Sequence, residues 1–148
     1  PYIKKYAKAH ALHNNHGMNW PIYRYSEVLL FLAEALIEQN KLADAAPFLN
    51  QVRTRAGLAN ATATTQAALR DAVYQERRVE LAFESKRLFD LVRTGRLETV
   101  IKAYGDRVKA NKARYYFPAE GFVPADAFSN ITPYYGLPAA ESDLSPNF

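Results

Sequence analysis

The chain contains no cysteine among its 148 residues. Disulfide bonds, thiolate catalysis and zinc or iron–sulfur centres held by cysteine are therefore excluded within it. Long apolar runs are also missing. The longest uncharged apolar stretch, residues 28–33, has six residues, whereas a membrane-spanning helix needs about 18–20. What remains is ordinary globular composition, 49% hydrophobic and 23% charged, at a length typical of one domain.

Basic residues are absent from the last part of the chain. Residues 118–148 hold no Lys or Arg, four acids and five of the eight prolines. All 19 basic residues and the other 11 acids precede this segment, so residues 1–117 have a balance of +8 and residues 118–148 one of −4. Such a shift predicts a basic, helical body followed by an acidic tail rich in proline and aromatic residues.

Helical periodicity covers most of the body. A first helix is expected over about 23–39, directly after Pro21, and its apolar residues go round most of its circumference, so it must be packed on several sides. A second is expected over about 41–56 and ends at Gly57. Because Pro47 lies inside it, either a kink near 43–46 or a late start at 45–46 is expected. The two helices would form an antiparallel hairpin.

Three further helices follow in the prediction. One is capped by Thr64 or Thr65 and runs to Glu84, one runs from 85 or 86 to 94 and ends at Gly95, and a weak one covers 96–103. Short strands are expected at 2–6 and 115–117. The fold class is therefore mainly α, with a helical scaffold over 23–103 and an extended, loop-rich tail over 111–148.

Two glutamates share an apolar helical face. Glu76 and Glu80 recur with Leu69 and Val73 at three- and four-residue spacing, and buried carboxylates need partners. The nearest candidates are Arg77, Arg87 and Arg93, with Asp90 three residues from each of the last two. An acid pair could perform general acid/base catalysis, but three neighbouring arginines keep both acids ionised. We therefore interpret Glu76, Arg77, Glu80, Arg87, Asp90 and Arg93 as a structural ion network.

Several motifs carry a resemblance to one family. They are RYSEVLL at 24–30 followed by AEA at 33–35, LNQVRTRAGL at 49–58, ERRVELAFE at 76–84 with Arg87, Asp90 and Arg93, YFP at 116–118, and the terminal LSPNF. In this order they resemble the SusD/RagB family of outer-membrane nutrient-binding proteins. The chain departs from the family pattern at Ser85, where glycine is usual, and at Ala119 and Glu120, where Ile-Pro is usual.

The resemblance implies a fold, a location and a partner. Residues 1–148 are expected to be the C-terminal part of a single SusD-like domain, a superhelix of tetratricopeptide-like helix pairs. The missing part would carry a lipidated cysteine that anchors the protein at the outer-membrane surface. The family binds glycans, or peptide in some members, and presents them to a SusC-type TonB-dependent transporter. It is not an enzyme family, and neither a cofactor nor a metal is expected.

Sugar-binding residues do not follow from the motifs, so candidates come from residue type. Flat aromatic rings beside amides and acids suit sugar rings. Trp20 precedes the first helix, and Tyr134 and Tyr135, with Asn130 nearby, lie in the tail; packing on the scaffold or at the transporter interface is the alternative for each. The 115–117 aromatics are expected in the core.

Other functions are less well supported. A helical-repeat module that binds peptide or protein cargo is the alternative function. Nucleic-acid binding is not expected, because the arginines are interleaved with acids. His10, His13 and His16 fall at three-residue steps, but their Asn- and Gly-containing surroundings favour a loop over a metal site. Ser26 and Ser85 have no nearby histidine that could activate a nucleophile.

Overall fold

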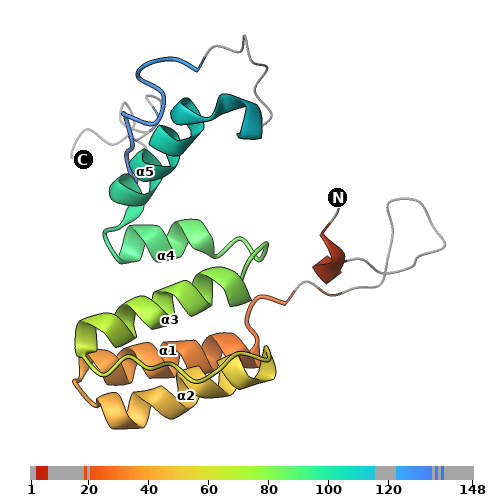
Figure 1. Ribbon diagram of the computed structural model, residues 1–148, viewed down its shortest axis with the longest axis vertical. Coiled ribbons are helices and arrows are strands. Elements are labelled where there is room, and N and C mark those ends of the chain that lie inside the picture. Colours follow the sequence, from red (N-terminus) through yellow and green to blue (C-terminus); the bar gives the residue numbers. More distant parts are fainter. Residues whose placement is uncertain are drawn as a thin grey trace, which may run out of the picture. The chain divides into compact units, whose positions relative to one another are not determined.

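Helices make up all the regular secondary structure in the part of the chain that the computed structural model describes, which is residues 3–6, 19, 21–115, 123–134, 136 and 138. The elements are η1 (Lys4–Tyr6), α1 (Tyr25–Glu38), α2 (Leu42–Arg55), α3 (Gln66–Glu80), α4 (Arg87–Arg93), α5 (Leu97–Ala110) and η2 (Lys112–Tyr115) (Figure 1). The mainly α fold class predicted from the sequence is confirmed. The chain divides into two compact units, unit 1 (Pro1–Arg87) and unit 2 (Leu88–Phe148).

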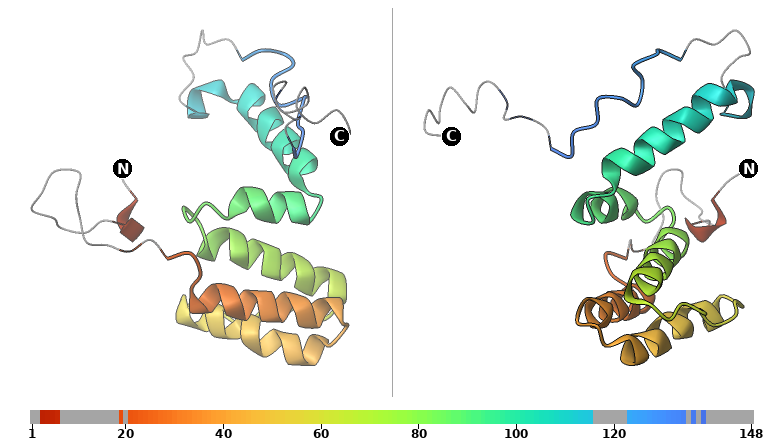
Figure 2. Two further views of the ribbon diagram at one scale, coloured as in Figure 1. Left: turned by 180° about the vertical axis from the view of Figure 1, so that it is seen from behind. Right: turned by 60° about the vertical axis from the view of Figure 1, so that its left-hand side comes forward.

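Unit 1 is held together by the buried face of α1. This helix packs against both α2 and α3, which also contact each other (Figure 2). Leu30, Ala33 and Ile37 of α1 are fully buried. The rest of the core is Leu29 of α1, Ala45, Leu49 and Val52 of α2, and Leu69 and Val73 of α3. Each fully buried Leu, Ile or Val stabilises the fold by about 1.5–3 kcal/mol.

Helix α2 begins at Leu42 and contains Pro47, so the expected late start at 45–46 is wrong. The amide of Ala45 already donates to the carbonyl of Lys41 at 3.1 Å. Pro47 is exposed, so its ring faces solvent, and the helix loses one backbone hydrogen bond at that position. Pro47 is the sixth residue of α2, so this bond is one that a helix without proline would make.

Helix α3 begins as predicted but ends earlier. The hydroxyl of Thr65 accepts a hydrogen bond from the amide of Ala68 at 3.3 Å, which makes Thr65 the N-cap. The helix ends at Glu80 and not at Glu84. A turn follows in which Phe83 and Ser85 have φ angles of 66° and 59°. Ser85 stands where the family pattern has glycine, the residue that adopts this conformation without strain.

Unit 2 contains α4 from Leu88 onward, α5, η2 and the described part of the tail. Gly95 ends α4 as expected, with φ at 66°, while the amide of Arg96 donates to the carbonyl of Leu91 at 2.9 Å. Helix α5 continues to Ala110, so the expected end at 103 is wrong. Gly105 lies inside the helix. Its lack of a side chain makes room for Phe128, since a Cβ at position 105 would lie 2.6 Å from the Phe128 Cβ.

The two expected strands are corrected where the structure describes them. Lys4–Tyr6 and Lys112–Tyr115 are 3-10 turns, and Tyr2, Tyr116 and Phe117 lie outside the described residues. The described residues contain no strand with which either segment could pair, and a strand without a partner is not stable in water. No described helix is long and apolar enough to cross a membrane.

Candidate functional site

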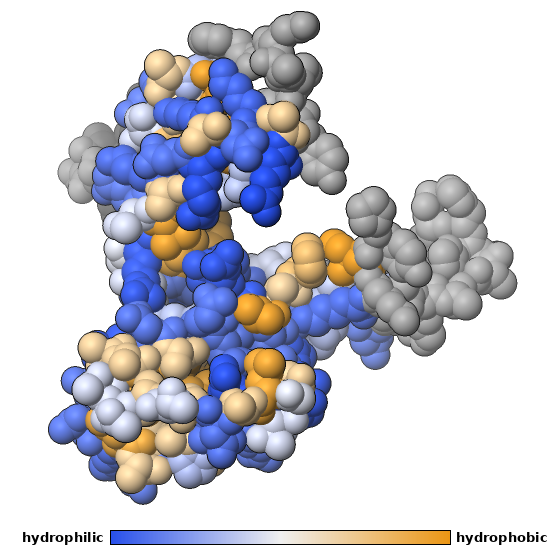
Figure 3. Space-filling view, viewed as in Figure 1, coloured by the Kyte–Doolittle hydropathy of each residue, from blue (hydrophilic) through white to orange (hydrophobic). Residues whose placement is uncertain are grey.

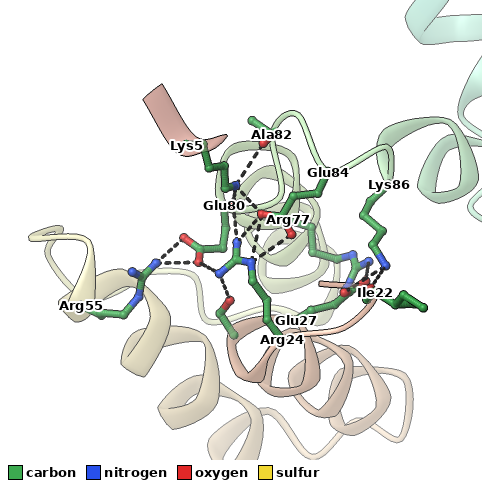
Figure 4. A network of polar contacts seen from close by, with 11 residues as sticks. Lys5, Ile22, Arg24, Glu27, Arg55, Arg77, Glu80, Ala82, Glu84 and Lys86 are labelled. Carbon is green, nitrogen blue, oxygen red and sulfur yellow. Dashed lines mark hydrogen bonds and ion pairs between the residues drawn. The ribbon is translucent and has the colours of Figure 1, made fainter. Parts of the chain in front are cut away.

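A polar network in unit 1 is centred on Arg24, which lies immediately before α1 (Figure 4). Its Nε donates to both carboxylate oxygens of Glu84 at 3.0 Å. Its Nη1 donates to Glu80 Oε1 at 2.5 Å and also to the Ser26 hydroxyl. Its Nη2 donates to the backbone carbonyl of Glu80 at 2.5 Å. One guanidinium therefore binds the last residue of α3, the turn beyond it and the start of α1.

Glu80 is shared by two arginines. Arg55, the last residue of α2, donates from Nη2 to the two Glu80 carboxylate oxygens at 2.6 and 2.7 Å. The Glu80 side chain is 8% exposed. Burial by itself raises the pKa of Glu80, but the hydrogen bonds from Arg24 and Ser26 and the charges of Arg24 and Arg55 outweigh it, so this pKa lies below its ordinary value. The carboxylate stays ionised and links all three helices of unit 1.

Glu84 is held in the same way from the other side. Lys5 of η1 forms an ion pair with Glu84 and donates from Nζ to the carbonyls of Glu80 at 2.8 Å and Ala82 at 3.0 Å. Burial by itself raises the pKa of Glu84. The hydrogen bonds and charges of Arg24 and Lys5 lower it by more than burial raises it, so the net shift is downward. Lys5 and Arg24 thus both donate to the backbone carbonyl of Glu80 at the end of α3. If the helix continued, this carbonyl would accept a backbone hydrogen bond instead.

A second charged cluster lies beside the first. The Glu27 carboxylate pairs with Arg77 Nη2 at 3.5 Å and with Lys86 Nζ at 3.3 Å. Both Glu27 and Arg77 are 2% exposed at the side chain. The Arg77 guanidinium also lies 4.3 Å from the ring centroid of Phe31, and Lys86 Nζ 4.4 Å from that of Tyr23. Arginine and lysine therefore neutralise the carboxylate that α1 buries.

The structure gives the predicted glutamates partners that the sequence did not suggest. Glu76 pairs with Arg53 Nη1 at 3.0 Å, and Glu80 pairs with Arg24 and Arg55. These arginines are outside the set of Arg77, Arg87 and Arg93 that sequence proximity suggested. The physical reason is that α2 and the start of α1 lie against α3, so their arginines reach the carboxylates. In unit 2, Asp90 pairs with Arg93 at 2.9 Å within α4, which Arg87 begins.

The network centred on Arg24 holds its two carboxylates in the ionised form. A general acid needs a carboxyl whose pKa is raised, whereas those of Glu80 and Glu84 are lowered. Within the described residues no group of three or more His, Asp or Glu is placed to hold a metal ion. The three histidines of the sequence expectation lie outside these residues. The network is built to join segments.

A cleft of about 330 Å³ opens where α1 begins and α2 ends. Its lining combines the buried apolar side chains of Leu29 and Val52 with polar groups and one exposed ring. The full set is Arg24, Tyr25, Ser26, Leu29, Gln51, Val52 and Arg55. From Tyr25, 69% exposed, an apolar stripe continues along α1 through Val28 at 51% and Leu32 at 41%. This face of α1 is the part of the helix that unit 1 leaves open.

Unit 2 carries an aromatic cluster that the sequence did not indicate. The Tyr104 ring of α5 makes edge-to-face contacts with Tyr115 of η2, at 5.6 Å between centroids, and with Phe128 of the tail, at 5.9 Å. Lys109 donates to the carbonyl of Ala125 at 2.7 Å. These contacts place residues 125–128 along α5. No periodic pattern links Tyr104 to Phe128, so only the folded chain reveals the cluster.

The candidate sugar-binding residues are placed in part. Tyr134 is 75% exposed, and Asn130 is exposed as well; both belong to unit 2. Trp20 and Tyr135 lie outside the described residues. Tyr115, expected in the core, is half-buried against Tyr104.

Comparison with known proteins gives one consistent answer. The model of the SusD family matches residues 1–148. SusD-like protein P25 of Formosa agariphila is 37% identical over 142 residues, which cover 89% of this chain and 23% of that protein. SusD-like protein P2 of the same organism is 37% identical over 106 residues, 63% of this chain and 21% of that protein. The chain thus matches between a fifth and a quarter of the length of these relatives. No solved structure gives a match.

Proposed function

Because the chain belongs to the SusD family, we propose that the protein binds glycans without cleaving them. Family membership over the whole chain is the observation that carries this proposal. The buried charges of unit 1 support it, because cations hold Glu80 and Glu84 in the ionised form, whereas a glycosidase requires a protonated carboxyl as its general acid.

We place this binding at the bacterial cell surface. By analogy with the family, the protein works at the outer membrane, attached through a lipid on sequence outside these residues, and delivers its glycan to a SusC-type TonB-dependent transporter. A pull-down from outer-membrane extract with the tagged full-length protein tests this step. Recovery of a TonB-dependent transporter supports it, and its absence from an extract in which the transporter is detected contradicts it.

The tail supplies the proposed contacts with sugar. Tyr134 is the most exposed of the described large hydrophobic residues, and Asn130 would supply amide hydrogen bonds. Tyr135 belongs to the same proposed set, and Trp20, which belongs to unit 1, is a separate candidate. An exposed ring with a neighbouring amide offers both the flat apolar face and the polar rim that sugars require.

Affinity electrophoresis of the full-length protein through gels that contain different polysaccharides tests the function. Retardation by a glycan that is recovered intact supports it, and no retardation in any gel contradicts it. The double variant Tyr134→Ala/Tyr135→Ala should weaken the retardation and leave the melting temperature unchanged. Phe83→Ala is the matched control, because Phe83 is 63% exposed but lies on unit 1. Unchanged retardation of the double variant would remove these tyrosines from the site.

Peptide or protein cargo is the second candidate, and the open face of α1 favours it. The Tyr25–Val28–Leu32 stripe leads into the cleft between α1 and α2, and apolar residues at this spacing suit an amphipathic helix. Fluorescence anisotropy with labelled amphipathic peptides measures such binding directly. Binding that Val28→Asp abolishes would support this candidate; equal binding by the variant would exclude the stripe as its site.

A further inference from the structure

We propose that unit 2 binds an anionic sugar, a uronate or a sulfated residue, on the surface formed by Tyr104, Arg107, Lys112 and Arg114, here called the α5–η2 cationic surface. The inference rests on the proposed function of glycan binding and adds the chemical class of the glycan. It uses residues of α5 and η2 that the motifs of the sequence do not include.

The Tyr104 ring is fixed in orientation and still accessible. Two edge-to-face contacts hold it, with interplanar angles of 86° to Tyr115 and 81° to Phe128. The residue nevertheless remains 40% exposed. A ring that is already immobilised loses little conformational entropy when a ligand stacks on it. The exposed part of Tyr104 is therefore a preorganised aromatic surface against which a sugar can pack.

Basic residues without a carboxylate partner among the described residues lie on α5 and η2, the elements that carry Tyr104 and Tyr115. In unit 2, Arg93 pairs with Asp90 and Lys102 pairs with Glu98. Lys109 donates a hydrogen bond to the carbonyl of Ala125. Arg96 is engaged as well. Three basic residues are left, Arg107, Lys112 and Arg114, and none of them has a carboxylate partner among the described residues. Their charge is available to a ligand.

Two of these cations, Arg107 and Arg114, can be related to the ring. The Arg107 guanidinium lies 5.9 Å from the centroid of Tyr104. Arg114 directly precedes Tyr115, whose ring contacts Tyr104. Both arginines are exposed. The face of α5 and η2 turned to the viewer in Figure 3 is largely hydrophilic, with isolated apolar residues. This arrangement favours a polar, charged ligand over an extended apolar partner.

The local charge balance points the same way. Residues 96–115 contain six basic residues and two acids, Glu98 and Asp106, which gives a balance of +4. Guanidinium groups bind carboxylate and sulfate-like oxygens through two parallel hydrogen bonds, and these are stronger than bonds between neutral groups. A sugar stacked on Tyr104 could direct such a group to Arg107. A neutral sugar would leave this charge unused.

Affinity electrophoresis of the full-length protein in three gels tests the inference: polygalacturonate for carboxylates, dextran sulfate for sulfates, and neutral dextran. We expect retardation in one or both anionic gels that falls as salt is added. The Arg107→Gln/Arg114→Gln variant should lose at least tenfold in affinity for the anionic glycan. The control Lys41→Gln/Arg78→Gln removes the same charge from exposed positions of unit 1 and should leave the affinity within twofold.

The outcomes separate this inference from the function on which it rests. Retardation by polygalacturonate alone or by dextran sulfate alone identifies the anionic group. Retardation only by neutral dextran overturns the inference and leaves glycan binding intact. Equal losses in the unit 2 variant and its unit 1 control would show attraction by overall charge and also overturn it. No retardation in these gels or in a wider panel of neutral polysaccharides contradicts the proposed function itself.

Discussion

Replacing Glu80 with alanine should destabilise unit 1 strongly, because three segments meet at this carboxylate. The change removes the acceptor of Arg24 Nη1 at 2.5 Å and of Arg55 Nη2 at 2.6 Å. Removing one member of a buried ion pair costs about 3–5 kcal/mol when the other is left uncompensated. Here Arg24 keeps its two bonds to Glu84, and the Arg55 side chain is 62% exposed, so it can regain water.

The expected loss is therefore smaller than for an isolated buried pair. The variant loses one charge-assisted hydrogen bond, from Arg24, at a partly buried site and a weaker contribution from Arg55. We therefore expect the free energy of unfolding to fall by about 2–3 kcal/mol. Urea unfolding followed by circular dichroism at 222 nm measures this as a shift of the midpoint without a change of slope. A loss of that size would establish Glu80 as part of the scaffold.

Glu38→Ala is the matched control. Glu38 accepts two hydrogen bonds from Arg70, at 2.5 and 2.7 Å, so its geometry is as good as that of Glu80. Its side chain is 48% exposed, and exposed ion pairs contribute little to stability. The two variants should differ clearly. Equal losses, or a Glu80→Ala chain that unfolds at the parent's midpoint but no longer binds glycan, would refute the structural interpretation of the network.

Three further predictions concern unit stability. Folding lowers the pKa of Glu80 and Glu84 below 4.5, so their contribution is complete above about pH 4.5 and is lost as pH falls through the lower folded-state values. Urea midpoints measured from about pH 6 to 3 should fall more steeply for the parent than for Glu80→Gln; parallel curves would contradict this. Gly105→Ala should lower the melting temperature, although alanine is the better helix former by about 1 kcal/mol, because its Cβ overlaps Phe128; a gain would refute that packing. Ser85→Gly should stabilise by about 0.5–1 kcal/mol, because Ser85 has φ at 59°, and a loss in urea unfolding would show that the conformation carries no strain.

Local signals predicted the helices well, because they depend on residues close in sequence. The Thr65 cap and the Gly95 terminus act within one turn, and both were found where expected. The error at the end of α3 occurs where distant residues decide. Helix α3 ends at Glu80 because Arg24 and Lys5, 56 and 75 residues away, bind its last carbonyl. Contacts between residues so far apart produce no periodic pattern in the sequence.

The candidate sites divide in a similar way. The sequence identified Glu76 and Glu80 as acids on an apolar face, and the structure buries the first and nearly buries the second. It could not identify their partners, since Arg53 and Arg24 approach from other helices. The aromatic candidates remain predictions, because exposure at Tyr134 permits binding without demonstrating it.

The network also explains why family membership predicts a scaffold better than a ligand. Arg24 lies in the first motif, Arg53 and Arg55 in the second, and Glu76, Glu80 and Glu84 in the third. In the folded chain these three motifs meet as ion pairs. The residues that make the chain recognisable are thus largely those that hold its helices in register. Tyr104, Arg107 and Arg114 lie outside every motif, so family membership does not predict them, and the proposed α5–η2 cationic surface can be tested independently of the residues that identify the family.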